Sequence, residues 1–195
     1  MERPTASAAA TPVALSVAPL QSSQWRILRA LSTASAEDTP AELGVSARDM
    51  YWTSPDEWQA QAASWSPPDA HLGVASVGGD AVGMLGIRRG TRRPCRAEAV
   101  NFWVAADHRH QGVASALIRD GLLWALRNEV TDLECHVLRS NRPAERIYRA
   151  GGMRRSVLSN LTARHFVSMR VNIAGLGQVV DLSATSRPPG GPEVG

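Results

Sequence analysis

A turn between an apolar strand and a helix carries the residues with the clearest chemical use. The apolar segment 99–105 is followed by Arg109, Gly112 and Ala114, spaced R-x-x-G-x-A at the start of a predicted helix. A helix start exposes backbone N–H groups that have no intrahelical partner, and it carries the positive end of the helix dipole. Small residues there let a phosphate approach the backbone. The spacing therefore predicts a cradle for a pyrophosphate.

A second group of spaced residues follows the next predicted strand. Asn141, Ala144 and Tyr148 precede Gly152 and Met153 in the order N-x-x-A-x-x-x-Y-x-x-x-G-M. Asn141 is also a good N-cap for a helix that begins at residues 142–143. Ala144 and Tyr148 share one helical face, so packing in the core is the alternative role of Tyr148.

Together these residues resemble two motifs of the GCN5-related N-acetyltransferases. The first is similar to that family's acyl-CoA signature, Q/R-x-x-G-x-G/A, and the second departs from the family pattern only by Met153 in place of an aromatic residue. The resemblance covers roughly residues 12–172. It implies an α/β fold with a mixed, mostly antiparallel sheet of about seven strands and four helices. It also implies an enzyme that uses acetyl-CoA as co-substrate and a primary amine as acceptor.

The resemblance further implies how acetyl-CoA is held. In this family the fourth and fifth strands separate after a β-bulge, which leaves backbone groups free, and the pantetheine arm enters the gap. Backbone groups near Val104 and Ala106 would bind the amides of the arm, and Asn141 resembles a residue that contacts it. The pyrophosphate would rest on the backbone N–H groups of the turn, formed by Arg109, His110, Gln111, Gly112, Val113 and Ala114.

Two residues are predicted to move protons. By resemblance, Tyr148 is the general acid that protonates the departing CoA thiolate. Glu98 lies eleven residues before Arg109 and resembles the base of the histone-acetylating branch, which takes a proton from the ammonium. The alternatives are that the Glu98 carboxylate is solvated or is paired with Arg96, and that ordered water relays the proton instead.

The acceptor is harder to read from the sequence. Tyr51 and Trp52 are predicted to form its wall, because the first two helices shape the acceptor pocket in this family. Trp58 and Trp65 fall on one helical face and are interpreted as core residues. A small molecule is favoured over a protein N-terminus, and the arginine-rich loops favour an acceptor that is not strongly cationic.

Other functions fit less well. A catalytically silent acyl-CoA-binding module is the alternative, although Tyr148 and Glu98 favour an enzyme. A hydrolase is disfavoured because the sequence holds neither G-x-S-x-G nor H-E-x-x-H. His108 and His110 have no further ligands nearby, so no metal is expected. No cysteine lies in the strand-to-helix turn, which favours direct attack of the amine in a ternary complex over a covalent acyl-enzyme.

The composition narrows the remaining classes. All 21 basic residues are arginine, which excludes a Walker-type phosphate loop and a lysine Schiff base. A net charge of +3 without a basic helix predicts no nucleic-acid partner. No apolar run approaches the ~20 residues that span a membrane, and no secretory signal is evident. For the same reason no membrane partner is expected. Cys95 and Cys135 lack disulfide or metal spacing, which favours a protein of the reducing cytoplasm. A homodimer stays open, since dimers are common in the family.

The elements that position these residues follow from periodicity and turn signals. Strands are predicted over residues 13–17, 72–77, 81–88, 98–105, 132–138, 153–161 and 165–172, and helices after Ser22–Ser23, from Ser54 to about Trp65, over 112–127 and over 143–150. The predicted domain spans residues 12–173. Residues 1–11 and 174–195 are rich in small residues and proline, which is typical of disordered segments.

Overall fold

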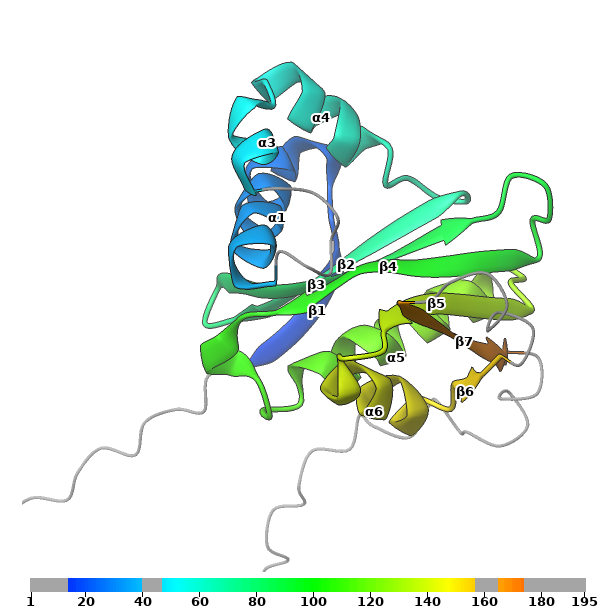
Figure 1. The fold of residues 1–195 in the computed structure, drawn as a ribbon. Coiled ribbons are helices and arrows are strands. Elements are labelled where there is room, and N and C mark those ends of the chain that lie inside the picture. Colours follow the sequence, from blue (N-terminus) through cyan, green and yellow to red (C-terminus); the bar gives the residue numbers. More distant parts are fainter. Residues whose placement is uncertain (1–13, 40–46, 157–164, 174–195) are drawn as a thin grey trace, which may run out of the picture.

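The structure, a computed structural model, describes residues 14–39, 47–156 and 165–173, and of residues 47–49 only the backbone (Figure 1). The strands are β1 (Leu15–Pro19), β2 (Ala70–Val77), β3 (Asp80–Arg89), β4 (Arg96–Val104), β5 (Asp132–Leu138), β6 (Arg154–Arg155) and β7 (Phe166–Asn172). The helices are α1 (Trp25–Asp38), α3 (Ala47–Trp52), α4 (Pro55–Ala63), α5 (Val113–Arg127) and α6 (Arg142–Ala150), with short 3-10 helices η1 (Ser22–Gln24) and η2 (Ala106–His108).

The seven strands form one open sheet in the order β1-β2-β3-β4-β5-β7-β6. Every neighbouring pair is antiparallel except β4 and β5, which are parallel. The predicted fold class is therefore confirmed. The described residues hold five α-helices, one more than predicted, and the additional helix is α3. In this described part of the chain, each helix is too short or too polar to cross a lipid bilayer.

Turn and cap residues fix the ends of several elements. Gly78 and Gly79 have φ values of 64° and 95° and connect β2 to β3 as a two-residue hairpin. Ser54 caps α4 reciprocally with Glu57, and Pro55 occupies the first turn. Helix α4 ends at Ala63, two residues before the predicted end.

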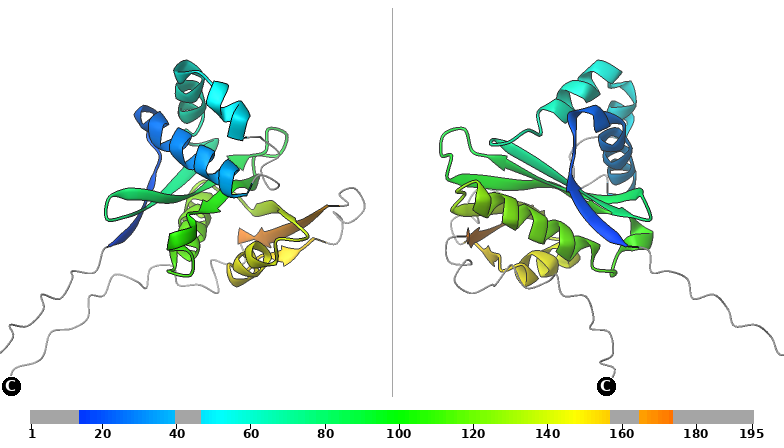
Figure 2. Two further views of the ribbon diagram at one scale, coloured as in Figure 1. Left: turned by 60° about the vertical axis from the view of Figure 1, so that its left-hand side comes forward. Right: turned by 180° about the vertical axis from the view of Figure 1, so that it is seen from behind.

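Helices cover both faces of the sheet (Figures 1 and 2). On one face α1 and α4 bury an apolar cluster that includes Trp58 and Trp65, which confirms these two tryptophans as core residues. On the other face α5 and α6 bury a larger cluster. Helix α5 contributes a stripe at helical spacing, formed by Val113, Leu117 and Trp124. Each helix thus packs its apolar stripe on one side of a shared sheet.

Strands β4 and β5 separate partway along their length. They pair only from Arg96–Asp132 to Ala99–Cys135. Just beyond this point β4 carries a bulge, where Asn101 and Phe102 stand opposite the single residue Leu85 of β3, and Asn101 has a φ of 54°. A bulge bends its strand and leaves ladder groups unpaired. The predicted bulge and the opening that follows it are confirmed.

The remaining differences concern the ends of the sheet. Strand β1 begins two residues later than predicted, and Val13 lies outside the described residues. Of the predicted last hairpin, β6 has two residues and pairs with β7, while residues 157–164 lie outside the described part. The segments 1–11 and 174–195, predicted to be disordered, lie outside it as well.

Candidate active site

The turn that carries R-x-x-G-x-A lies where β4 ends and α5 begins. Gly112 is the N-cap of α5 with a φ of 85°, no side chain caps this helix, and its first turn holds no acidic residue. Within the described part of the chain, none of the backbone N–H groups of residues 110–115 donates a hydrogen bond to a protein acceptor. These groups, at the positive end of the helix dipole, are available to an anion.

Arg109 holds this turn in place. Its backbone N–H donates to the carbonyl oxygen of Ala106 at 3.2 Å, and its Nε donates to that of Val104 at 2.9 Å. Its guanidinium also binds Asp38, the last residue of α1, whose carboxylate accepts a hydrogen bond from Trp103 Nε1 at 2.9 Å. Hydrogen bonds from Trp103 and Arg109 hold the pKa of Asp38 below its usual value. The backbone N–H of Arg109 is therefore engaged, and the predicted cradle begins at residue 110.

The β4 edge that faces the opening also differs in detail from the prediction. The carbonyl oxygens of Val104 and Ala106, expected to be free, accept the two hydrogen bonds from Arg109. Among the described strands, β5 pairs with β4 only as far as Ala99. The β5-facing edge of residues 100–103 therefore has no strand partner, and it offers the backbone groups that an extended arm would use.

A cavity of about 100 Å³ occupies the opening between β4 and β5. Tyr148 of α6 lines it, and only 5% of this residue is exposed. Its ring centroid lies 5.2 Å from that of Phe102, and its side chain hydrogen-bonds to Cys135. Phe102 and Cys135 thus hold the ring at the opening. The other lining residues are Ser35, Thr39, Ala99, Val100, Asn101, His136, Val137, Leu138, Asn141, Ala144 and Phe166.

The two cysteines are free thiols, of which Cys95 is exposed and Cys135 is buried. Burial, followed by the carboxylate of Glu134, raises the pKa of the Cys135 thiol to about 12. The thiolate is the nucleophilic form of cysteine, so the Cys135 side chain is a protonated, unreactive thiol at neutral pH. Cys95 lies just before β4, at the opposite end of that strand from the turn.

The first turn of α6 is well anchored, which fixes the position of Tyr148. Asn141 caps the helix, since its Oδ1 accepts the N–H of Ala144 at 2.9 Å, and the predicted N-cap is confirmed. Glu145 is buried and accepts two hydrogen bonds from Arg155, at 2.8 and 2.7 Å. These bonds hold the pKa of the Glu145 carboxyl below its usual value. Asn141 lines the cavity as well, so capping does not remove it from the site.

Glu98 lies on the opposite face of the sheet from Tyr148. It alternates along β4 with Ala97 and Ala99, which are buried on the α5 side together with Tyr148. Its side chain is half exposed, and its Oε1 lies 3.7 Å from Nε2 of His136. Glu98 lies on a strand in the middle of the sheet and is not paired with Arg96. It does not line the cavity.

His136 is the residue of this region that sequence reasoning missed. It directly follows Cys135, the last β5 residue paired with β4, and it lines the cavity. No motif contains it. Only the alternation of side chains along β5 could have indicated its importance. This alternation places His136 on the same face as Glu134, next to the point where β4 and β5 separate.

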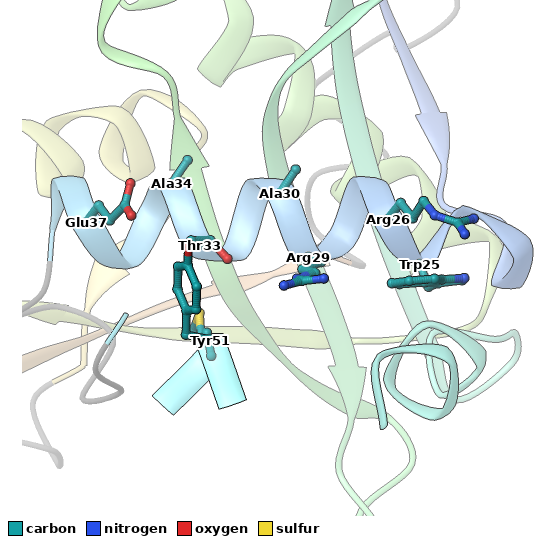
Figure 3. A pocket seen from close by; sticks show the side chains of 9 residues that line it. Trp25, Arg26, Arg29, Ala30, Thr33, Ala34, Glu37 and Tyr51 are labelled. Atoms are coloured by element: carbon teal, nitrogen blue, oxygen red, sulfur yellow. The ribbon is translucent and has the colours of Figure 1, made fainter. Parts of the chain in front are cut away.

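The predicted acceptor wall lies elsewhere. Tyr51 and Trp52 belong to α3 and are 73% and 81% exposed. Tyr51 contributes to a groove of about 500 Å³ along α1, where Figure 3 shows its ring beside Thr33. Among the described residues, none that lines this groove also lines the cavity between β4 and β5. The structure therefore does not bring Tyr51 and Trp52 to Tyr148.

The other polar residues singled out by the sequence have local roles. Among the described residues, no group of three histidine, cysteine or acidic side chains is arranged to hold a metal ion. Gln111 donates to the carbonyl oxygen of Asp107 at 2.7 Å. His110 has a φ of 61°, so two residues of the turn, His110 and Gly112, take the left-handed conformation.

The arrangement combines three capabilities. Free N–H groups at the start of α5 suit a diphosphate, and the unpaired edge of β4 suits an extended amide-containing arm. The cavity then presents a phenol from one face of the sheet and an imidazole from the other. Such groups supply and remove protons during attack on a carbonyl carbon.

The comparisons with known proteins agree with this geometry. The sequence profile of the acetyltransferase (GNAT) family matches residues 34–152. No curated protein sequence gives a significant match. An acetyltransferase of the GNAT family from Streptococcus pneumoniae superposes with a TM-score of 0.70 at 14% identity, over 82% of this chain and 99% of its own.

Two similar structures were solved with coenzyme A. The PaiA N-acetyltransferase from Thermoplasma acidophilum has a TM-score of 0.66 at 15% identity, over 82% of this chain and 99% of its own. RimL, a ribosomal L7/L12 alpha-N-protein acetyltransferase, has a TM-score of 0.66 at 15% identity, over 83% of this chain and 96% of its own. At these identities the likeness is one of fold.

Proposed function

Because the chain belongs to the acetyltransferase (GNAT) family, we propose that it transfers an acetyl group from acetyl-CoA to a primary amine by direct attack within a ternary complex. The family makes it a transferase that acylates amines. The observation that carries the finer proposal is the uncapped start of α5, which lies at the end of the same strand, β4, that lines the cavity with Tyr148. A diphosphate and a thioester would then be held by one continuous surface.

The residues toward acetyl-CoA have separate roles in this proposal. The N–H groups of residues 110–114, which include His110, Gln111, Gly112, Val113 and Ala114, would hold the diphosphate. The edge of residues 100–103 and Asn141 would hold the pantetheine arm. Tyr148 would donate its phenolic proton to the departing sulfur.

The reaction balances with one proton released. The amine nitrogen forms a bond to the carbonyl carbon, the carbon–sulfur bond breaks, and its electron pair leaves on sulfur as a thiolate. An ammonium acceptor brings three protons on nitrogen: the amide keeps one, a second restores the phenol after Tyr148 has protonated the sulfur, and the third leaves to water. The face of the sheet that carries Glu98 is where the amine would lose the proton that is released to water.

Direct attack is supported by the state of the cysteines. The Cys135 thiol is buried and its pKa is raised to about 12, and Cys95 lies at the far end of β4. A covalent acyl-cysteine needs a thiolate beside the thioester. We therefore favour a ternary complex over a two-step mechanism with an acyl-enzyme.

The acceptor class follows the expectation from the sequence. The cavity of about 100 Å³ between β4 and β5 is assigned here to the pantetheine arm and the thioester, so it does not set the size of the acceptor. A small primary amine is favoured over a protein N-terminus. A peptide with a free N-terminus belongs in any acceptor panel, because RimL is described as an alpha-N-protein acetyltransferase.

Release of free thiol from acetyl-CoA with a panel of amines tests this function. The sequence contains no lysine, so transfer to an amine of the enzyme itself is limited to its N-terminus and the background is low. We expect amine-dependent thiol release, and Tyr148→Phe should lower kcat about 100-fold while the KM for acetyl-CoA changes little. CoA binding without thiol release for any acceptor would instead indicate the catalytically silent module.

A further inference from the structure

We propose that His136 is the catalytic base that takes the proton from the acceptor amine, with Glu98 and Ser168 as the residues that position its ring. This assignment rests on the proposed acetyl transfer. It differs from the expectation drawn from sequence, in which Glu98 itself takes the proton. The geometry of β4, β5 and β7 favours the imidazole.

His136 has access to the cavity in which the reacting atoms would lie. His136 lines the cavity that also contains Tyr148, whereas Glu98 does not. Glu98 stands in register with Glu134, inside the paired part of β4 and β5, and His136 is the first β5 residue past that pairing. Along the strands, His136 therefore lies closer to the opening than Glu98 does. With 45% of its side chain exposed, His136 also has water to which it can pass a proton.

His136 and Tyr148 approach the cavity from different sides of the sheet. His136 alternates with Cys135 and Val137, which are buried in the cluster on the α5 and α6 side that also contains Tyr148. Its side chain therefore projects from the other face. Attack on a thioester needs a base at the incoming nitrogen and an acid at the departing sulfur. Tyr148 and His136 approach the same cavity from opposite faces, as these two tasks require.

The orientation of the His136 ring is fixed by its neighbours. Nδ1 of His136 lies 2.8 Å from the hydroxyl oxygen of Ser168, which stands directly opposite on β7 and is buried. When Ser168 accepts a hydrogen bond from Nδ1–H, the lone pair of Nε2 is free to take a proton. The imidazolium that forms lies beside the Glu98 carboxylate, 3.7 Å from Nε2. Glu98 thus stabilises the product of the proton transfer.

The surrounding charges leave Glu98 available for this role. Arg170 of β7 binds Glu134 at 3.3 Å. Arg88, opposite Glu98 on β3, lies over the ring of Trp65 at 3.8 Å and donates to Ser64. Within the described residues, the ion pair of Glu98 is with His136. The titratable and charged groups around His136 on its face of the sheet are Glu98 of β4, Arg170 of β7 and Glu134 of its own strand, and Tyr148 lines the same cavity from the other face.

The proton count follows that of the proposed reaction. Nε2 takes one proton from the ammonium, which frees the nitrogen lone pair for attack on the carbonyl carbon. The nitrogen loses a second proton when the amide forms, and this proton replaces the one that Tyr148 gives to sulfur. The proton on His136 leaves to water, so the imidazole is neutral again for the next cycle.

The test compares pH profiles of amine-dependent thiol release for the wild type, His136→Gln, Glu98→Gln and Ser168→Ala. Glutamine keeps hydrogen-bonding capacity but cannot titrate near neutrality. We expect His136→Gln to lower kcat/KM for the amine about 100-fold at pH 7, and to remove the acidic inflection of the profile. The loss should shrink at high pH, where the free amine predominates. The Kd of CoA, measured by calorimetry, should stay within about twofold because the diphosphate cradle is untouched.

The companion variants separate base from positioning residues. Glu98→Gln should lower the rate about tenfold and keep the inflection, since it removes a carboxylate that stabilises the imidazolium but not the base itself. Ser168→Ala should lower the rate about tenfold and keep the inflection. His165→Gln, a histidine just before β7 that does not line the cavity, is the matched control and should behave as the wild type.

Three results would overturn the assignment. His136→Gln could retain the wild-type rate, or lose rate equally at every pH with the inflection unchanged, which would make His136 structural. Glu98→Gln could abolish the inflection while His136→Gln keeps it, which would return the base role to Glu98. A wild-type protein that binds CoA but releases no thiol with any amine would remove the proposed function, and this assignment with it.

Discussion

At the scale of single residues, Gly112 is the position on which the diphosphate cradle most depends. Its φ of 85° is costly for any residue with a Cβ, and a Cβ built there meets no atom within 4 Å. Gly112→Val should therefore cost about 1–2 kcal/mol of stability through backbone strain and place a side chain in the space above the free amides. We expect the Kd of CoA to rise at least about tenfold, measured by calorimetry, with the fold retained.

Gly79 supplies a matched control for this strain. It has a φ of 95°, it also has no atom within 4 Å of a built Cβ, and it lies in the β2–β3 hairpin away from the turn. Gly79→Val should lose a similar amount of stability without any change in CoA affinity. Equal loss of affinity in both variants would show that the effect is general destabilisation, and unaltered affinity in Gly112→Val would contradict the cradle.

One local feature of this site was predicted correctly. Asn141 is the N-cap of α6, because an N-cap hydrogen bond is a property of local sequence. His136 was missed because its relevance depends on where the parallel pairing of β4 and β5 stops, which is a long-range property. Tyr148 is buried in the core and also lines the cavity, and its role as general acid stays a prediction.

At the scale of elements, the ion pair between Asp38 and Arg109 joins the end of α1 to the turn before α5. A carboxylate at a helix C-terminus is unfavourable toward the helix dipole, so its position there is explained by this pairing. Asp38→Asn keeps an acceptor for Trp103 but removes the charge that faces Arg109. We expect the Kd of CoA to rise about three- to tenfold, with a loss of about 1 kcal/mol in stability at pH 7.

The pH dependence of this loss has a definite sign. The pKa of Asp38 in the folded state is lowered from its ordinary value of 3.8. The contribution of the carboxylate is therefore complete above that value and is lost as the pH falls through the folded-state pKa. The difference in the free energy of unfolding between wild type and Asp38→Asn should shrink in acid denaturation experiments below pH 4. A difference that grows in acid would contradict the assignment.

Long elements were predicted more reliably than short ones. Strand β5 has the predicted bounds and α5 begins one residue after the predicted start, since each carries a strong apolar period. Helix α3 has six residues and was not predicted, because so short a helix depends on its contacts with α1. Tyr51 and Trp52 lie on this helix and are largely exposed, and their role in the acceptor wall stays a prediction.

At the scale of the whole molecule, the two parts of the sheet are joined by only four parallel residue pairs between β4 and β5. Helix α5 reinforces this junction, because it packs against β1 to β4 and also contacts α6. A ligand whose diphosphate binds the start of α5 and whose arm fills the opening would connect the same parts. CoA binding and global stability should therefore be strongly linked.

This linkage can be measured as a thermal shift. At a CoA concentration of 100 times Kd, binding contributes about 2.7 kcal/mol to the folded state. A chain of this size gains roughly 2–4 °C in Tm per kcal/mol, so we expect an increase of about 5–10 °C. Pantetheine at the same concentration lacks the diphosphate and should give little shift, and Gly112→Val should respond weakly to CoA. If pantetheine matched CoA, the opening between β4 and β5 would dominate binding, and the free amides at the start of α5 would lose the role on which the function is proposed.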